Sequence, residues 1–81
     1  MKLPRDLSAE NLVKALASYG YDRTRQSGSH IRLTRISHGK EHNITIPEHQ
    51  PIKVGTLSAI IKDIARHLEK EPSELIKELF G

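Results

Sequence analysis

The clearest hydrophobic pattern lies in the second half of the chain, where apolar residues recur at the spacing of one helix face. The stripe consists of Leu57, Ile60, Ile61, Ile64, Ala65 and Leu68. This i, i+3, i+4, i+7, i+8, i+11 pattern predicts a helix over residues 56–70 with one face in the core. After it, Pro72 suits the first position of a last short helix, whose cap would be Glu71, a poor capping residue.

A second helix is predicted near the start of the chain. Ser8 suits an N-cap because its hydroxyl can accept a free backbone N–H, and Leu7 and Leu12 stand where a hydrophobic staple would pack. Gly20 supplies the left-handed residue that commonly ends a helix. The pattern therefore predicts a helix over residues 9–19.

The middle of the chain alternates between apolar and polar residues, as strands do. In residues 29–36, Ile31 and Leu33 point one way, while His30, Arg32 and Thr34 point the other. Weaker strand patterns cover residues 21–26 and 42–46, with turns predicted at 27–29 and 37–41 and a loop at 47–51. Three strands so close in sequence favour an antiparallel meander.

The order of these elements, α-β-β-β-α-α, predicts an α+β fold with a three-stranded antiparallel sheet and helices on one face. Its 81 residues predict a single domain over 1–81. Such a domain buries only about 60% of its unfolded surface, so any active site should be shallow. The chain has no cysteine and no apolar run near the roughly 20 residues of a membrane span, and its first residues do not resemble a secretion signal. We therefore expect a cytoplasmic protein without disulfides or thiolate zinc sites.

The net charge of +3 is mild, but the excess cations gather in one quarter of the chain. Residues 21–40 hold one acid against five cations, which are Arg23, Arg25, Arg32, Arg35 and Lys40. A local basic field attracts phosphates, and this favours a nucleic-acid partner. A solvated strand face without a partner explains the charge equally well.

His30 is the candidate catalyst. His30 and Arg32 stand two residues apart, on one side of a strand and about 7 Å from each other along it. Imidazole exchanges protons near neutral pH and a guanidinium suits a phosphate, so the pair suffices for metal-free RNA cleavage. Gly28 and Ser29 allow close backbone approach and offer a hydroxyl. From spacing alone, an exposed histidine without a role explains His30 as well.

The start of the long helix is a second candidate site. Free backbone N–H groups near Lys53, Gly55 and Thr56 would make a phosphate seat. An ordinary helix start with a surface lysine is the alternative. The remaining histidines (38, 42, 49 and 67) show no ligand spacing, so neither a metal nor another cofactor is predicted, and His67 is expected to be solvated.

Three stretches in order resemble the HicA-type toxins of toxin–antitoxin pairs, over about residues 2–66. They are KLPRDLSAENLVKALASYGY, RQSGSHIRL and ITIPEHQPIKVGTLSAIIKDI. The resemblance implies a double-stranded-RNA-binding-like α-β-β-β-α fold and metal-independent cleavage of mRNA as part of a stress response. It also implies that the histidine of the Gly-Ser-His step, His30, is catalytic, and that a HicB-type antitoxin covers the active face.

Three functional hypotheses follow. The first is an endoribonuclease toxin of a type II system, with His30 as general base and RNA bound by Arg25, Ser29, Arg32, Lys53, Gly55 and Thr56. The second is an RNA-binding module without catalytic activity. The third is a small protein-interaction domain whose basic strip meets an acidic partner.

Overall fold

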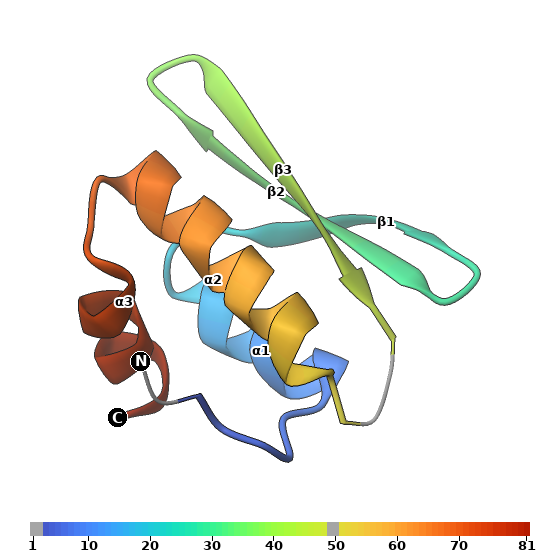
Figure 1. The fold of residues 1–81 in the computed structure, drawn as a ribbon. Coiled ribbons are helices and arrows are strands. Elements are labelled where there is room, and N and C mark those ends of the chain that lie inside the picture. The colour runs from blue at the N-terminus through green and yellow to red at the C-terminus, as the bar shows by residue number, and fades with distance from the viewer. Residues whose placement is uncertain (1–2, 49–50) are drawn as a thin grey trace.

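In the residues that the structure describes, three helices and three strands follow one another in the predicted order (Figure 1). The computed structural model describes residues 3–48 and 51–81. Its elements are α1 (Ala9–Ala17), β1 (Asp22–Ser27), β2 (His30–Ser37), β3 (Lys40–Pro47), α2 (Val54–Leu68) and α3 (Pro72–Phe80). The α+β class and the additional C-terminal helix are confirmed. His49 and Gln50, which fall in the predicted loop 47–51, lie outside the described residues.

The sheet is an antiparallel meander in the order β1-β2-β3, and the helices cover one of its faces (Figure 1). Ile31 lies opposite Ile46, and Leu33 lies opposite Ile44, so the apolar residues of β2 and β3 share a face. The period-2 alternation predicted for β2 is therefore confirmed. A register shift between Arg23 and Arg25 marks an irregularity in β1.

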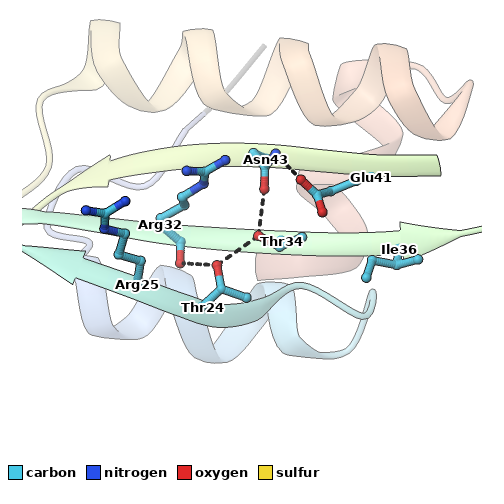
Figure 2. Close-up of a pocket in the computed structure, with 7 residues that line it drawn as sticks. All are labelled: Thr24, Arg25, Arg32, Thr34, Ile36, Glu41 and Asn43. Atoms are coloured by element: carbon cyan, nitrogen blue, oxygen red, sulfur yellow. Dashed lines mark hydrogen bonds between the residues drawn. The ribbon is translucent and has the colours of Figure 1, made fainter. Parts of the chain in front are cut away.

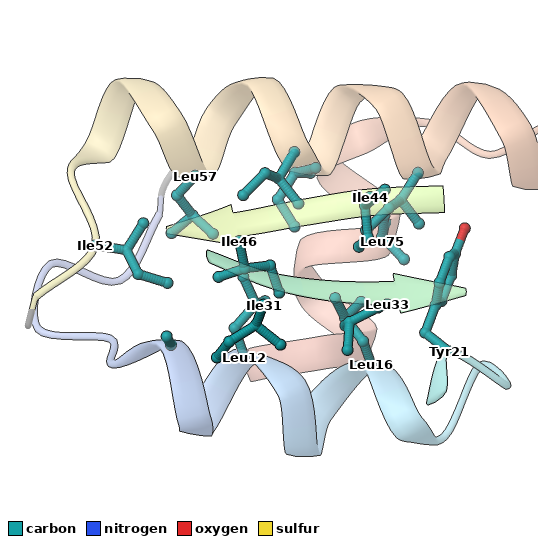
Figure 3. Packing of buried hydrophobic residues seen from close by; sticks show 14 of the residues in the cluster. Leu12, Leu16, Tyr21, Ile31, Leu33, Ile44, Ile46, Ile52, Leu57 and Leu75 are labelled. Atoms are coloured by element: carbon teal, nitrogen blue, oxygen red, sulfur yellow. The ribbon is translucent and has the colours of Figure 1, made fainter. Parts of the chain in front are cut away.

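The core lies between this apolar sheet face and the three helices (Figure 3). Leu12 and Leu16 of α1 and Leu57 of α2 point at the sheet, and all three are fully buried. Ser8 caps α1 as predicted, because its hydroxyl accepts the Asn11 backbone N–H at 3.1 Å. At roughly 25 cal/mol per Å² of buried apolar surface, this core is the main stabilising contribution to the fold.

Several helix ends differ from the sequence-based prediction. Helix α1 ends at Ala17, two residues before the predicted Tyr19, because a turn at 18–20 leads into Gly20 with φ of +86°. Helix α2 begins at Val54 and ends at Leu68, where Glu69 adopts a left-handed conformation. The Glu69 N–H bonds to the carbonyls of Ala65 and Arg66 and closes the last turn, whereas the prediction extended the helix to residue 70.

The turn between β2 and β3 is also tighter than predicted. It consists of His38 and Gly39, whose φ angles are 52° and 77°. Two positive φ angles in a two-residue loop are typical of a type I′ hairpin. Strand β3 therefore begins at Lys40 instead of 42, and Glu41 and His42 become strand residues on opposite faces of the sheet.

The longest helix in residues 3–48 and 51–81 is α2, which has 15 residues. No helix in this part of the chain is both long and apolar enough to cross a bilayer.

Candidate functional site

The sheet surface that faces away from the helices is called the outer face here. Four β2 side chains point to it, namely His30, Arg32, Thr34 and Ile36. Ile36 is 71% exposed, so its apolar side chain stands free on this face. The predicted direction of His30, Arg32 and Thr34 is confirmed.

His30 is the first residue of β2 and directly follows the β1–β2 hairpin turn, and its side chain is exposed. It sits between Ser27 of β1 and Pro47 of β3. The Ser29 carbonyl accepts the Glu48 N–H at 2.6 Å, and this bond ties the turn to the end of β3. His30 is thus held in place by backbone pairing while its imidazole remains free to meet a ligand.

Arg25 and Arg32 are cross-strand partners on the outer face, and both are exposed. Directly opposed like charges destabilise a sheet, and an anion bound between the two guanidinium groups would relieve their repulsion. Arg23 and Arg35 do not join them. Arg23 pairs with Glu10 at 2.5 Å, and the Arg35 Nε donates to the Tyr19 carbonyl at 2.8 Å. The basic quarter of the sequence is therefore divided between the two sides of the sheet.

The outer face is hollowed into a depression of about 310 Å³, which a chain of hydrogen bonds crosses (Figure 2). Thr24 Oγ1 lies 2.8 Å from Thr34 Oγ1, which donates to Asn43 Oδ1 at 2.6 Å. The Asn43 amide donates to the Glu41 carboxylate at 2.9 Å. The sequence pattern does not indicate this arrangement, because the four residues meet through the β1 irregularity and through the start of β3 at Lys40. Arg25 and Arg32 border the depression at one end, and Ile36 and Glu41 border it at the other.

The second predicted site, the start of α2, lies in the helical layer and not on the outer face (Figure 1). Lys53 is the N-cap and makes no side-chain capping bond, and Gly55 and Thr56 lie in the first turn. Lys53 therefore leaves the backbone N–H groups of the first turn without a side-chain cap. A phosphate site needs such uncapped N–H groups. A role for Lys53, Gly55 and Thr56 in RNA binding stays a prediction.

Two other histidines meet on the helix side of the sheet, in a group of side chains that we call the inner-edge cluster. His42 stacks on His67, with ring centroids 4.2 Å apart and planes inclined by 11°. His67 Nε2 lies 3.3 Å from the Arg35 guanidinium. The prediction that His67 is solvated holds only in part, because its half-buried ring stacks on His42 and meets Arg35. The cluster comprises Tyr21, Arg35, His42, Asp63 and His67.

The hydrogen bonds of this cluster fix the tautomer of His42. The Asp63 carboxylate can only accept, so the His42 nitrogen that faces it at 3.4 Å, Nε2, carries the ring proton, and Nδ1 accepts the Tyr21 hydroxyl at 2.7 Å. Burial raises the pKa of that phenol to about 12 and so keeps its proton in place. Arg35 has only donors, so the nitrogen of His67 that it meets must be an acceptor. The cluster therefore holds His42 and His67 in structural roles.

Acid should weaken this cluster. Desolvation lowers the pKa of His67 from its usual 6.5, and the charges of His42, Arg35 and Lys40 lower it further. The Asp63 carboxylate raises this pKa and offsets part of the shift. The folded chain then binds fewer protons than the unfolded chain, so stability is highest above pH 6.5 and falls as the pH drops through the folded-state pKa.

Thermal unfolding above and below pH 6.5 tests this, with His67→Gln beside the parent. We expect the melting temperature of the parent to fall more on acidification than that of the variant. His38→Asn, at the exposed hairpin turn, should keep the parent's response. If acidification lowered the melting temperature equally in the parent and in His67→Gln, the inner-edge cluster would not be the cause of the acid sensitivity.

Within residues 3–48 and 51–81, no group of three or more histidine, aspartate or glutamate side chains is arranged to hold a metal ion. His49, one of the histidines considered above, lies outside these residues.

Comparison with known families places this geometry in context. Residues 9–65 match the family model described as "HicA toxin of bacterial toxin-antitoxin". The chain belongs to the HicA toxin family. The match spans α1, the whole sheet and most of α2, and it includes every predicted site residue. Membership makes the chain the toxin of a toxin–antitoxin pair and implies an antitoxin partner. Neither the curated proteins nor the solved structures gave a significant match.

Proposed function

We propose that this HicA-family toxin is a metal-independent endoribonuclease that cleaves mRNA in the cytoplasm, with His30 as its general base. One observation carries the proposal. Among the histidines of residues 3–48 and 51–81, only His30 stands exposed on a sheet face beside unpaired arginines. His42 and His67 are engaged in the inner-edge cluster, and His38 lies in the opposite hairpin turn.

In the proposed reaction, Arg25 and Arg32 hold the phosphate that is to be cleaved. His30 removes the proton of the adjacent ribose 2′-OH, whose oxygen attacks phosphorus as the bond to the 5′-oxygen breaks. The departing 5′-oxygen takes up a proton from water, the His30 imidazolium returns its proton to water, and a 2′,3′-cyclic phosphate remains on the other fragment. Holding the reacting groups and stabilising charge at phosphorus supply the rest of the rate increase.

Purified toxin incubated with mRNA in EDTA tests the proposal. We expect cleavage that EDTA does not reduce, and growth arrest when the toxin is expressed without its antitoxin. Intact RNA after prolonged incubation with folded protein would refute the endoribonuclease assignment.

Arg32→Gln should lower the affinity for RNA. It should also make that affinity less sensitive to salt concentration. A lost phosphate contact lowers the slope of log affinity against log salt by about 1. Arg5→Gln is the matched control, because Arg5 is exposed but lies before α1. Fluorescence anisotropy over a salt series measures both slopes. Equal slopes for the two variants would remove Arg32 from the proposed phosphate contact.

A second candidate function is RNA binding without cleavage. One observation favours it: in the described part of the chain, no side chain forms a hydrogen bond with His30 that would orient its ring. This function predicts salt-sensitive binding with no products, and greater loss of affinity in Arg32→Gln than in His30→Asn.

We also propose that the antitoxin is of the HicB type and covers the outer face. The exposed Ile36 and the nearby arginines offer an apolar anchor within a polar surface, as protein interfaces do. RNA and antitoxin would then compete, and a Ile36→Asp substitution should weaken antitoxin binding.

A further inference from the structure

We infer that the outer-face depression is a nucleobase subsite that selects guanine next to the cleaved phosphate. The inference rests on the proposed binding of RNA to the outer face and extends it to a base preference. Its central element is Glu41, which the sequence analysis assigned to a turn and the structure places in β3.

The direction of the hydrogen bonds decides what Glu41 offers a ligand. A hydroxyl has one proton, and Thr34 donates its proton to Asn43 Oδ1. The Thr24 hydroxyl proton has two acceptors in reach, Thr34 Oγ1 at 2.8 Å and the Arg32 carbonyl at 3.5 Å, and the shorter contact makes Thr24 the donor to Thr34. The Asn43 amide donates to Glu41 Oε2. Each hydrogen bond in this series of four side chains is donated in the direction of Glu41. The Glu41 carboxylate is therefore held in one orientation and can still accept hydrogen bonds from a ligand.

Charges of both signs stand unpaired in the same depression. In the described residues, Glu41 forms no ion pair, and neither do Arg25 and Arg32. Two strand positions separate Arg32 from Thr34 and two more lead to Ile36, a span of about 13 Å. The arginines at one end require an anion, and the carboxylate at the other requires N–H donors. A ligand that satisfies both ends carries a phosphate and a donor-rich edge, as a nucleotide does.

Guanine fits the acceptor end best among the four bases. Its Watson–Crick edge carries two adjacent donors, N1–H and the N2 amino group, which match the two oxygens of a carboxylate. Adenine and cytosine each place an acceptor beside their amino group, which a carboxylate oxygen would repel. The exposed Ile36 beside Glu41 gives the base an apolar surface. Unstacked bases of single-stranded RNA are commonly read on this edge.

The order of side chains along β2 sets where the base lies relative to the chemistry. His30 comes first, the Arg25–Arg32 pair second, and the depression third. A phosphate on the arginines thus has the His30 imidazole on one side and the Glu41 carboxylate on the other. The selected base therefore belongs to a nucleotide that flanks the cleaved phosphate.

Binding measurements test the subsite without requiring cleavage. Labelled hexanucleotides of uridine, with one central guanosine, adenosine or inosine, are titrated in EDTA against His30→Asn protein and followed by anisotropy. We expect the guanosine oligomer to bind at least about fivefold more tightly than the adenosine oligomer, the lower limit for a bidentate contact. Inosine, which lacks the N2 amino group, should fall between them.

Glu41→Gln in the same background identifies the carboxylate as the source. It should weaken binding of the guanosine oligomer at least about fivefold and leave the uridine oligomer unweakened. Glu74→Gln on α3 removes the same charge far from the outer face and should preserve the guanosine preference.

Equal affinity for guanosine and adenosine, or equal effects of Glu41→Gln and Glu74→Gln, would overturn the subsite. So would an effect of Glu41→Gln on antitoxin binding alone. Cleavage by the wild-type toxin without a guanine preference refutes the subsite and leaves the endoribonuclease standing. Guanine-selective binding by a wild-type toxin that does not cleave RNA supports the subsite and refutes the endoribonuclease.

Discussion

His30→Asn is expected to lower the rate of RNA cleavage by about 10²–10⁴-fold, the usual contribution of a general base. Asparagine keeps a polar side chain at the first position of β2, where backbone pairing to Ser27 and Pro47 does not depend on the imidazole. Affinity for RNA should change little, because Arg25 and Arg32 supply the proposed phosphate contacts. Single-turnover cleavage and anisotropy separate the two effects.

His38→Asn is the matched control for this experiment. His38 is also an exposed histidine, placed in the β2–β3 turn next to the end of β2, and asparagine tolerates its left-handed backbone. This variant should cleave RNA at the wild-type rate. Full activity in His30→Asn, or an equal loss in both variants, would contradict the role assigned to His30.

Leu33→Ala is expected to destabilise the fold by about 2–5 kcal/mol. Leu33 is fully buried at the centre of the middle strand and faces the helical layer (Figure 3). Its loss leaves a cavity directly beneath Arg32 and Thr34, so the outer face should lose its order together with the core. Small domains have only about 5–15 kcal/mol of stability, so this loss takes a large share of it and raises the fraction of unfolded molecules.

Ile36→Ala provides the control for Leu33, since it removes atoms from the exposed side of the same strand. Its free energy of unfolding should lie within about 0.5 kcal/mol of the wild-type value. Urea denaturation followed by circular dichroism measures both variants. A small effect of Leu33→Ala would contradict the packing described for β2.

The alternation of apolar and polar residues in β2 predicts which side chains lie in the core and which lie on the outer face. This strict alternation placed Ile31 and Leu33 in the core and His30 and Arg32 on one outer face, and the structure agrees. This worked because a strand buried on one side leaves little freedom for register, as a one-residue slip would expose every core residue. The stripe of α2 is equally informative, because a helix that buries one face must repeat its apolar residues every three to four positions.

Contacts between residues far apart in sequence cannot be predicted from the local pattern of apolar and polar residues. His42 and His67 are far apart in sequence, and each alone reads as a surface histidine, yet the two rings stack. The hydrogen-bond chain depends on the register shift in β1 and on a two-residue turn at His38 and Gly39. The sequence pattern predicts a turn at Glu41, whereas the structure makes it a strand residue that faces the depression.

End-group analysis of one defined cleavage reaction tests the central claim most directly. The substrate is an RNA oligomer that the toxin cleaves at a mapped bond in EDTA, compared with the same oligomer carrying a single 2′-deoxy substitution on the 5′ side of that bond. We predict a 2′,3′-cyclic phosphate product by mass spectrometry from the first oligomer and no cleavage of that bond in the second. Cleavage of the substituted bond, or a product without the cyclic phosphate, would contradict a reaction in which His30 activates the 2′-hydroxyl.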